Sequence, residues 1–276
     1  MILAKVTFSG SGRCSRRHLK GLVETYLPRL LHQGQIGSEY FVASSGRAVH
    51  AFVQLVALDA YAPRFHSEYG RETLTALTHA LGQPPKWVIL DDDTRKRTGS
   101  WRRTPFLYLF THAFDDGPVF YRGDNGTAVP AYYLPVSYRD RESAFFWQDN
   151  YRHHDHVWLG CGALELPAYR ELVEPASELS QHGRDLCKRV EESTGIPTYY
   201  FLMWYWGRRA GETQRKCPGC GRTWRTKHAA EKGGDFWKFA FQCAQCRLVS
   251  HFADSCDDQR RAVIGEFKAA RRKTSG

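Results

Sequence analysis

In the first part of the chain, segments in which apolar residues alternate with polar ones, as in a strand, are followed by segments in which they recur every three to four residues, as in a helix. Strict alternation over Ile2–Phe8 predicts a strand, and an apolar stripe between Ser15 and His32 predicts a helix that Pro28 should bend or end early. A hairpin around Ser45-Gly46 follows, and then a helix over Ser67–Leu81 that ends before glycine and two prolines. These elements predict an α+β fold whose N-terminal part is a mixed or antiparallel sheet with helices.

The same reading continues to the C-terminus. Four further strands are expected, at Trp87–Leu90, Phe106–Thr111, Val119–Arg122 and Ala131–Val136. Four further helices are expected, at Arg139–His156, Pro167–Val173, Ser177–Ser193 and Asp257–Arg272. The β-prone run Tyr199–Trp206 predicts one more strand, and the composition turns basic after it. We therefore expect a body over residues 1–207, a ribbon over residues 208–256 and a basic C-terminal helix or tail over residues 257–276.

Two Cys-x-x-Cys pairs carry the strongest chemical pattern. Cys217 and Cys220 are separated by 22 residues from Cys243 and Cys246, a spacing typical of four-thiolate zinc sites. Two tight turns that face each other can supply the tetrahedron that Zn²⁺ prefers. A redox motif or a pair of disulfides is the alternative, but redox motifs usually occur singly. The pattern predicts one structural Zn²⁺ with no open coordination position.

The residues around the four cysteines predict the rest of the ribbon. Gly221 suits a turn that needs positive φ, whereas the second turn has Arg247 at the equivalent place and must close differently. Aromatic residues before Cys243, including Phe236 and Trp237, and apolar residues after Cys246 are typical of hairpin strands. The C-terminal part should therefore be a small zinc ribbon followed by a terminal helix.

Composition and charge narrow the classes of function. The chain has 276 residues, no apolar run long enough to span a membrane and no signal-peptide pattern, so we expect a cytoplasmic protein. Its net charge of +10 is unevenly distributed, because residues 208–276 hold 16 Lys and Arg against 7 Asp and Glu. Such clustering indicates a polyanionic partner, although a solvated basic surface is the simpler alternative.

If the partner is a nucleic acid, the ribbon supplies its contacts. Cations would bind phosphates and tryptophans would stack on bases. The candidates are Arg208, Arg209, Arg215, Lys216, Arg222, Trp224, Arg225, Lys227 and Trp237. The tryptophans can instead be ribbon core.

Two clusters in the body could bear metal chemistry. Asp91–Asp93 follow a strand, where acids can hold Mg²⁺ but can equally cap a loop. Within His153–His156, two histidines share a helix face with Asp149, although histidines near a helix C-terminus are also favoured by the dipole. Neither cluster has a second matching motif, and we expect no catalytic residue in the body.

Several segments together resemble a known family. Gly162-Ala-Leu-Glu, Ser177-Glu-Leu-Ser and Gly195-Ile-Pro-Thr-Tyr-Tyr-Phe, followed by a ribbon with Cys-Pro-x-Cys-Gly, are similar to bacterial zinc-ribbon-containing, possibly nucleic-acid-binding proteins of unknown function. The resemblance implies that the four cysteines are metal ligands and that the setting is the bacterial cytoplasm. It implies no substrate and no catalytic residue.

Three functions follow from these patterns. The first is a non-catalytic protein that binds DNA or RNA through the ribbon and tail. The second is a protein-binding regulatory or immunity-like adaptor with a purely structural ribbon. The third is a metal-dependent enzyme that acts on nucleic acid. We favour them in that order, and no membrane partner is expected.

Overall fold

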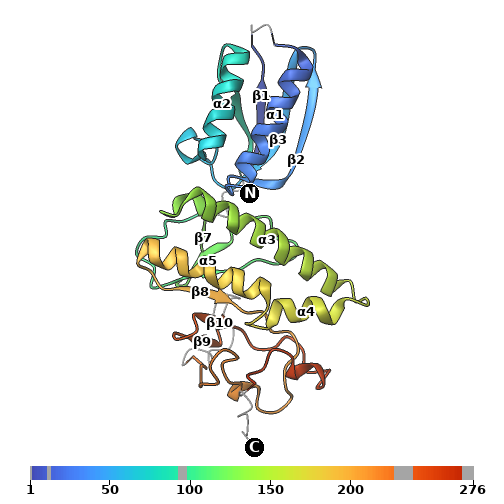
Figure 1. Cartoon of the computed structure of the whole chain (residues 1–276), viewed down its shortest axis with the longest axis vertical. Coiled ribbons are helices and arrows are strands. Elements are labelled where there is room, and N and C mark those ends of the chain that lie inside the picture. The colour runs from blue at the N-terminus through green and yellow to red at the C-terminus, as the bar shows by residue number, and fades with distance from the viewer. Residues whose placement is uncertain (1, 11–13, 93–97, 227–238, 269–276) are drawn as a thin grey trace, which may run out of the picture. The chain divides into compact units, whose positions relative to one another are not determined.

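The computed structural model describes residues 2–10, 14–92, 98–226 and 239–268 (Figure 1). The chain divides into two compact units. Unit 1 comprises Met1–Arg103, Asp115–Tyr121 and Thr127–Phe146, and unit 2 comprises Thr104–Phe114, Arg122–Gly126 and Trp147–Gly276.

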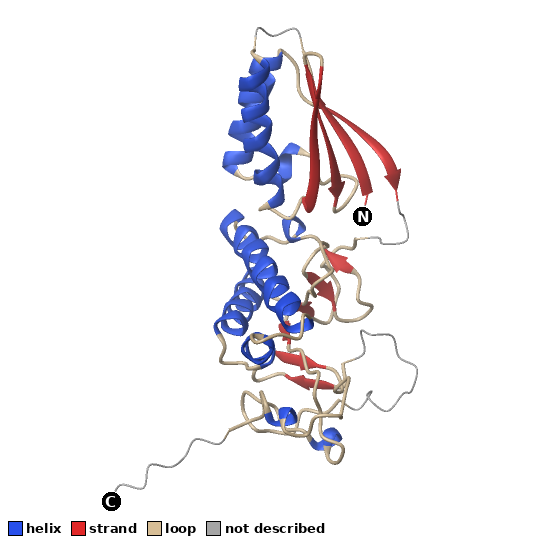
Figure 2. Cartoon of the chain, turned by 90° about the vertical axis from the view of Figure 1, so that its right-hand side faces the viewer, coloured by secondary structure: helices blue, strands red, loops and turns tan. Residues whose placement is uncertain are grey.

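Unit 1 is built on a four-stranded antiparallel sheet with two helices. Its elements in order are β1 (Ile2–Phe8), α1 (Arg16–Leu31), β2 (Ile36–Ser45), β3 (Ala48–Leu55), η1 (Pro63–Phe65), α2 (Glu68–Leu81) and β4 (Lys86–Asp92). The strands pair in the order β2-β3-β1-β4, so each β-α-β connection skips one strand. This is the split β-α-β topology. Figure 2 shows both helices on one face of the sheet.

Local signals set the ends of the two helices. The hydroxyls of Ser15 and Ser67 accept hydrogen bonds from the backbone N–H three residues on, and Gly82 ends α2 with a φ of 74°. Of the two effects expected of Pro28, a bend or an early end, the early end does not occur, because α1 continues to Leu31. Pro28 lies in the last turn, where it removes one helical hydrogen bond, and few residues follow it in the helix.

One face of the sheet forms the core of unit 1. Alternate residues of β1 and β3, such as Ala4, Val6 and Val53, are completely buried. They pack in one cluster with Val23 and Leu27 of α1. The alternation that predicts the strands therefore also determines which side of the sheet the helices cover.

The next segment contains a short hairpin and a long helix. β6 (Phe120–Arg122) pairs antiparallel with β7 (Ala128–Val129). The strand expected over Ala131–Val136 is wrong, because Pro130 leads into the 3-10 turn η2 (Ala131–Tyr133). α3 (Tyr138–Leu159) then contributes residues to both units. None of the helices in the described part of the chain is long and apolar enough to cross a membrane.

Unit 2 combines helices with a mixed sheet. Its elements are β5 (Leu107–Leu109), α4 (Glu165–Val173), α5 (Glu178–Thr194), β8 (Thr198–Phe201), η3 (Glu212–Gln214), β9 (Phe241–Cys243), β10 (Leu248–Ser250) and η5 (Arg261–Val263). Within the unit the strands follow the order β5-β8-β10-β9. The first two pairings are parallel and the last is antiparallel. The fold is thus α+β, with a small ribbon in its C-terminal region.

The ribbon shares a sheet with the preceding body residues. β10 lies within the expected ribbon, and it pairs with β8, which lies within the expected body. All four residues of β8 are buried. Residues on both sides of the expected boundary near residue 207 therefore belong to one compact unit.

The expected C-terminal helix over Asp257–Arg272 is absent from the described residues up to Lys268, which contain only the 3-10 turn η5. Gly265, with a φ of 80°, follows this turn, and a Cβ there would lie 2.9 Å from the carbonyl oxygen of Val173 and 3.0 Å from the Trp204 ring. Close packing against these residues therefore replaces continuation of a helix. Arg271, Arg272 and Lys273 lie outside the described residues.

Candidate metal centre and ribbon surface

The four predicted cysteine ligands lie together. Their Sγ atoms are all within 4.8 Å of one another, and those of Cys220 and Cys243 are 3.7 Å apart. A tetrahedron with Zn–S bonds of about 2.3 Å places its sulfurs roughly 3.8 Å apart. A disulfide needs about 2.05 Å, so none of the four is paired in that way. The arrangement can bind a metal ion such as zinc.

The first Cys-x-x-Cys turn, which we call the first knuckle (Lys216–Thr223), is closed by its backbone. Lys216 and Thr223 form an antiparallel bridge, and the N–H of Cys217 donates to the carbonyl of Arg222 at 2.9 Å. The N–H of Gly221 donates to the carbonyl of Cys217 at 2.8 Å, with a φ of 71° at this glycine. Gly221 therefore has the left-handed conformation that the sequence predicts for it.

The second knuckle (Cys243–Arg247) reaches the same conformation with an arginine. Arg247 has a φ of 51°, which is costly for a residue with a side chain. Its guanidinium donates two hydrogen bonds to the carboxylate of Glu191, at 2.9 and 2.7 Å, and one to the carbonyl of Ala244 at 2.8 Å. These bonds offset the strain and attach the knuckle to α5. Sequence reasoning missed Glu191, since nothing in its local pattern separates it from other helix-surface acids.

The surroundings of the sulfurs suit thiolates that share a cation. Burial raises the pKa of Cys217 to about 11 and also raises that of Cys246. The backbone N–H of Arg222 lowers the pKa of Cys220, and the N–H of Cys246 donates to Sγ of Cys243 at 3.4 Å. Buried thiolates need a positive charge between them, and a four-sulfur set is the donor chemistry of a closed zinc site. The residues present therefore fit such an ion.

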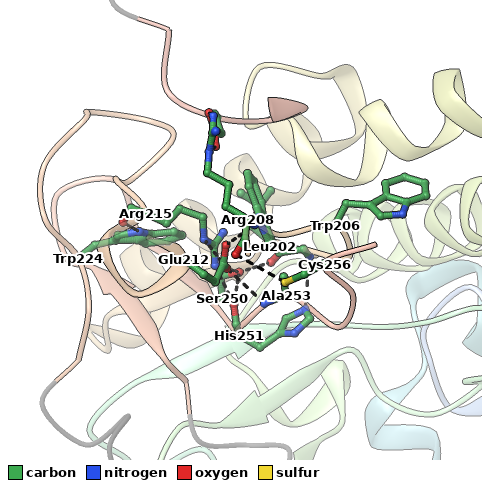
Figure 3. Close-up of polar contacts among 12 residues, drawn as sticks. Leu202, Trp206, Arg208, Glu212, Arg215, Trp224, Ser250, His251, Ala253 and Cys256 are labelled. Atoms are coloured by element: carbon green, nitrogen blue, oxygen red, sulfur yellow. Dashed lines mark hydrogen bonds and ion pairs between the residues drawn. The ribbon is translucent and has the colours of Figure 1, made fainter. Parts of the chain in front are cut away.

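Arg215 lies inside the ribbon (Figure 3). Its guanidinium carbon is 4.1 Å from the ring centre of Trp204, 4.2 Å from that of Phe241 and 5.2 Å from that of Trp224. Burial lowers the pKa of Arg215 to about 10, which still leaves it charged at neutral pH. A guanidinium enclosed by three rings cannot contact a phosphate, so the expectation that Arg215 binds nucleic acid is wrong.

Polar contacts complete the environment of Arg215. Its Nε lies 3.3 Å from a carboxylate oxygen of Glu212, and Nη2 donates to the carbonyl of His251 at 2.7 Å. The carboxylate of Glu212 in turn accepts from the N–H groups of Arg208 and Ala253, each at 3.3 Å (Figure 3). Arg215 thus connects the segment before the first knuckle to the segment after β10.

Trp224 is also part of this core. It is 3% exposed, its Nε1 donates to the carbonyl of Arg215 at 2.9 Å, and its ring lies 5.2 Å from that of Phe241. The expectation that Trp224 stacks on bases is therefore wrong, and the alternative that it is ribbon core holds. The other candidate tryptophan, Trp237, and the candidate cation Lys227 lie outside the described residues.

The remaining candidate cations are exposed and differ in their partners. The guanidinium of Arg208 binds Glu266 with two hydrogen bonds of 2.6 and 2.7 Å, and Nε of Arg209 donates to the carbonyl of Cys256 at 3.3 Å. Lys216, Arg222 and Arg225 form no ion pair within the described ranges. Lys216 and Arg222 lie on the first knuckle, and Arg225 follows it. A β-bridge between Arg225 and Phe241 fixes the backbone at Arg225.

The two candidate clusters of the body do not form metal sites in the structure described. Asp91 and Asp92 are exposed residues at the end of β4, and Asp93 lies outside the described residues. His153 faces Asp149 at 3.8 Å, while the carboxylate of Asp155 is buried and accepts from the N–H of Ala113 at 2.7 Å. Among the described residues, the four cysteines are the only group of three or more metal-ligating side chains close enough to hold an ion.

The metal centre and its supporting strands fall within regions that match described families. Residues 102–203 match the Domain of unknown function (DUF2310), and residues 207–256 match the Domain of unknown function (DUF8594). Two uncharacterized proteins of Haemophilus influenzae are each 32% identical to the chain over 168 residues, which is 60% of this chain. The matched stretch covers 80% of one relative and 62% of the other.

No solved structure matches the chain. The chain matches the DUF2310 model over residues 102–203, and it covers 80% of the length of one relative at 32% identity. The chain therefore belongs to the DUF2310 family, which has bacterial members and no known function.

Proposed function

We propose that the chain is a non-catalytic nucleic-acid-binding protein whose ribbon is held by one Zn²⁺. The observation that carries the proposal is the set of three exposed cations around the first knuckle, Lys216, Arg222 and Arg225, with no acidic partner in the described structure. Nearby arginines are committed to other groups, because Arg208, Arg215 and Arg247 each bind a carboxylate. Cations that stay unpaired on a rigid turn are available to phosphates.

Zinc would be bound by Cys217, Cys220, Cys243 and Cys246 and would supply structure alone. Four protein thiolates fill a tetrahedral site, which leaves no position for water or substrate. Among the described residues, backbone bonds and one side-chain hydrogen bond, from Nζ of Lys216 to Oγ1 of Thr223 at 3.1 Å, close the first knuckle, and the metal would complete it. The placement of the three cations therefore depends on the metal centre.

The geometry sets the number of phosphate contacts and hence the salt dependence. Arg209 is exposed, and its guanidinium donates to the carbonyl of Cys256 and pairs with no carboxylate in the described residues, so it can join the three knuckle cations. With about three to four contacts, log K should fall with log salt at a slope of roughly −3 to −4 on duplex DNA. We expect binding to be independent of base sequence, because contacts to phosphates carry no sequence information.

A second function, binding of a protein, has one observation in its favour. A groove of about 850 Å³ runs between α5 and both knuckles. Its walls mix charges of both signs with the amides Gln181 and Gln245, and two of its ion pairs, Arg247 with Glu191 and Lys188 with Glu192, are already formed. Such a lining suits a peptide segment better than a polyanion.

Two measurements on the full-length chain test the proposal. Metal analysis of the purified protein should give one zinc per chain. Anisotropy titrations of duplex and single-stranded oligonucleotides over a salt series should then show weaker binding and a slope less steep by about two units for Arg222→Glu combined with Arg225→Glu.

The control is Arg16→Glu combined with Arg17→Glu, which changes the net charge equally at exposed residues of α1. This control should leave the slope unchanged. Equal losses in both double variants would mean that net charge, and not the first knuckle, governs binding. Wild-type binding that is insensitive to salt would refute phosphate contact altogether.

A further inference from the structure

The sheet of unit 1 has a second face that neither α1 nor α2 covers. Alternate residues of its strands point into the core, and Figure 2 shows α1 and α2 on that side only. On the other side, which we call the open face, large apolar side chains are exposed. Phe41 is 72% exposed, Val88 41% and Leu3 40%. Large apolar side chains exposed on one face of a sheet can mark a binding site.

The strand register places the aromatic residues side by side. Phe41 of β2 pairs with Phe52 of β3, Phe52 pairs with Lys5 of β1, and Lys5 pairs with Val88 of β4. One row across all four strands therefore reads Phe-Phe-Lys-Val. The ammonium of Lys5 lies 5.8 Å from the centre of the Phe52 ring. Directly paired side chains are about 5 Å apart, so the two rings lie next to each other on this face.

The neighbouring row is polar. His50, Thr7 and Lys86 are paired in the same way across β3, β1 and β4, and Nδ1 of His50 lies 3.1 Å from Oγ1 of Thr7. These side chains offer hydrogen-bond donors and acceptors beside the two rings. Arg47, in the turn between β2 and β3, adds a cation at the same end of the sheet.

Carboxylates also lie on this sheet. Asp91 pairs with Leu3, and Glu39 precedes Phe41 by two residues on β2. Lys5 lies in the row of the aromatic pair, and Lys86 lies in the neighbouring row. Cations beside two rings suit a ligand that is both flat and anionic.

We propose that the open face binds a single-stranded nucleic acid, with bases stacked on Phe41 and Phe52 and phosphates held by Lys5 and Lys86. A duplex keeps its bases stacked inside, whereas a single strand can place them on exposed rings. A protein partner fits less well, because Lys5 lies at the middle of the face and lysine is depleted from the centres of protein interfaces. The inference goes beyond the ribbon proposal and stands without it.

The test uses the full-length, zinc-loaded chain and a short single-stranded oligonucleotide that carries 2-aminopurine, whose fluorescence reports stacking. Phe41→Ala should weaken binding of the single strand about tenfold and abolish the stacking signal, while duplex binding stays unchanged. Because Phe41 is so exposed, its loss should not unfold the sheet. Lys5→Glu should weaken single-strand binding too, whereas Asp91→Asn should leave it equal or tighter.

Phe114→Ala is the matched control, since Phe114 is 77% exposed and lies in unit 2. It should leave binding unchanged. The inference is overturned if Phe41→Ala binds the single strand within about twofold of wild type, or if sedimentation shows a dimer that Phe41→Ala abolishes. It is also overturned if the wild-type chain binds duplex and no single strand, a result that leaves the ribbon proposal intact.

The reverse outcome is distinguishable as well. If Arg222→Glu with Arg225→Glu leaves all binding unchanged while Phe41→Ala removes single-strand binding, the ribbon proposal fails and the open face stands.

Discussion

Replacing Arg215 by methionine should destabilise unit 2 strongly. Methionine keeps an unbranched apolar side chain among Trp204, Trp224 and Phe241 but removes the charge. The Arg215 side chain is 4% exposed and that of its partner Glu212 is 15% exposed, so the change leaves a carboxylate with little access to water. Breaking a buried pair from one side costs about 3–5 kcal/mol. We expect a loss near the lower value, because Glu212 also accepts two backbone hydrogen bonds.

A double-mutant cycle separates the ion pair from the packing. Glu212→Gln alone should cost about 1–2 kcal/mol, since the amide oxygen still accepts one of the backbone bonds. Arg215→Met combined with Glu212→Gln should be less destabilised than the sum of the two single changes by about 1–3 kcal/mol. The double variant no longer contains an unpaired buried charge.

Urea unfolding followed by tryptophan fluorescence measures these differences, because Trp204 and Trp224 both face the guanidinium. Salt-dependent binding to oligonucleotides is the second readout. If Arg215→Met were as stable as wild type within about 1 kcal/mol and its salt slope fell by about one unit, Arg215 would be a phosphate contact and our placement of it would be refuted.

Three further predictions concern the metal centre. Cys220→Ser or Cys246→Ser should abolish stoichiometric zinc by metal analysis and increase proteolysis of unit 2, because binding and folding are linked at a closed site. Gly219→Ala should weaken zinc about 10- to 100-fold in chelator competition, since its Cβ would lie 2.9 Å from Sγ of Cys246, whereas Gly162→Ala, with open space around it, should not. Glu191→Gln should cost about 1 kcal/mol at neutral pH. Arg247 lowers the pKa of Glu191, so this wild-type advantage is complete above the ordinary carboxyl pKa and disappears as pH falls through the lower folded value, which urea titrations at several pH values would show.

Features with a local cause could be predicted from the sequence. The N-cap Ser67 and the terminal Gly82 determine the ends of α2, and strict alternation determines β1. Both elements therefore lie where the pattern places them. The four cysteines could be identified because two Cys-x-x-Cys pairs at this spacing are typical of four-thiolate sites, and their sulfurs do lie together. In each case the determinants lie within a few residues of the feature.

Features that depend on distant residues could not be predicted. Arg215 reads as one cation of a basic stretch, and only the folded chain shows Trp204 and Phe241 around it. Trp224 is a ribbon tryptophan whose burial depends on the same cluster. Net charge therefore overstates the cations available to a ligand, because several are used inside the protein.

The strand pairing across residue 207 gives a last prediction. β8 lies between β5 and β10, and its residues Thr198–Phe201 are at most 5% exposed. A chain that ends after Gly207 would lose β10 and uncover an apolar strand edge, which is prone to pair with other chains. We expect this truncation to be insoluble or aggregated in size-exclusion chromatography. A soluble monomer with a cooperative thermal transition would show that residues 1–207 fold alone.

The regions that match the two families, residues 102–203 and 207–256, contribute strands to one sheet. Each should therefore need the other in order to fold.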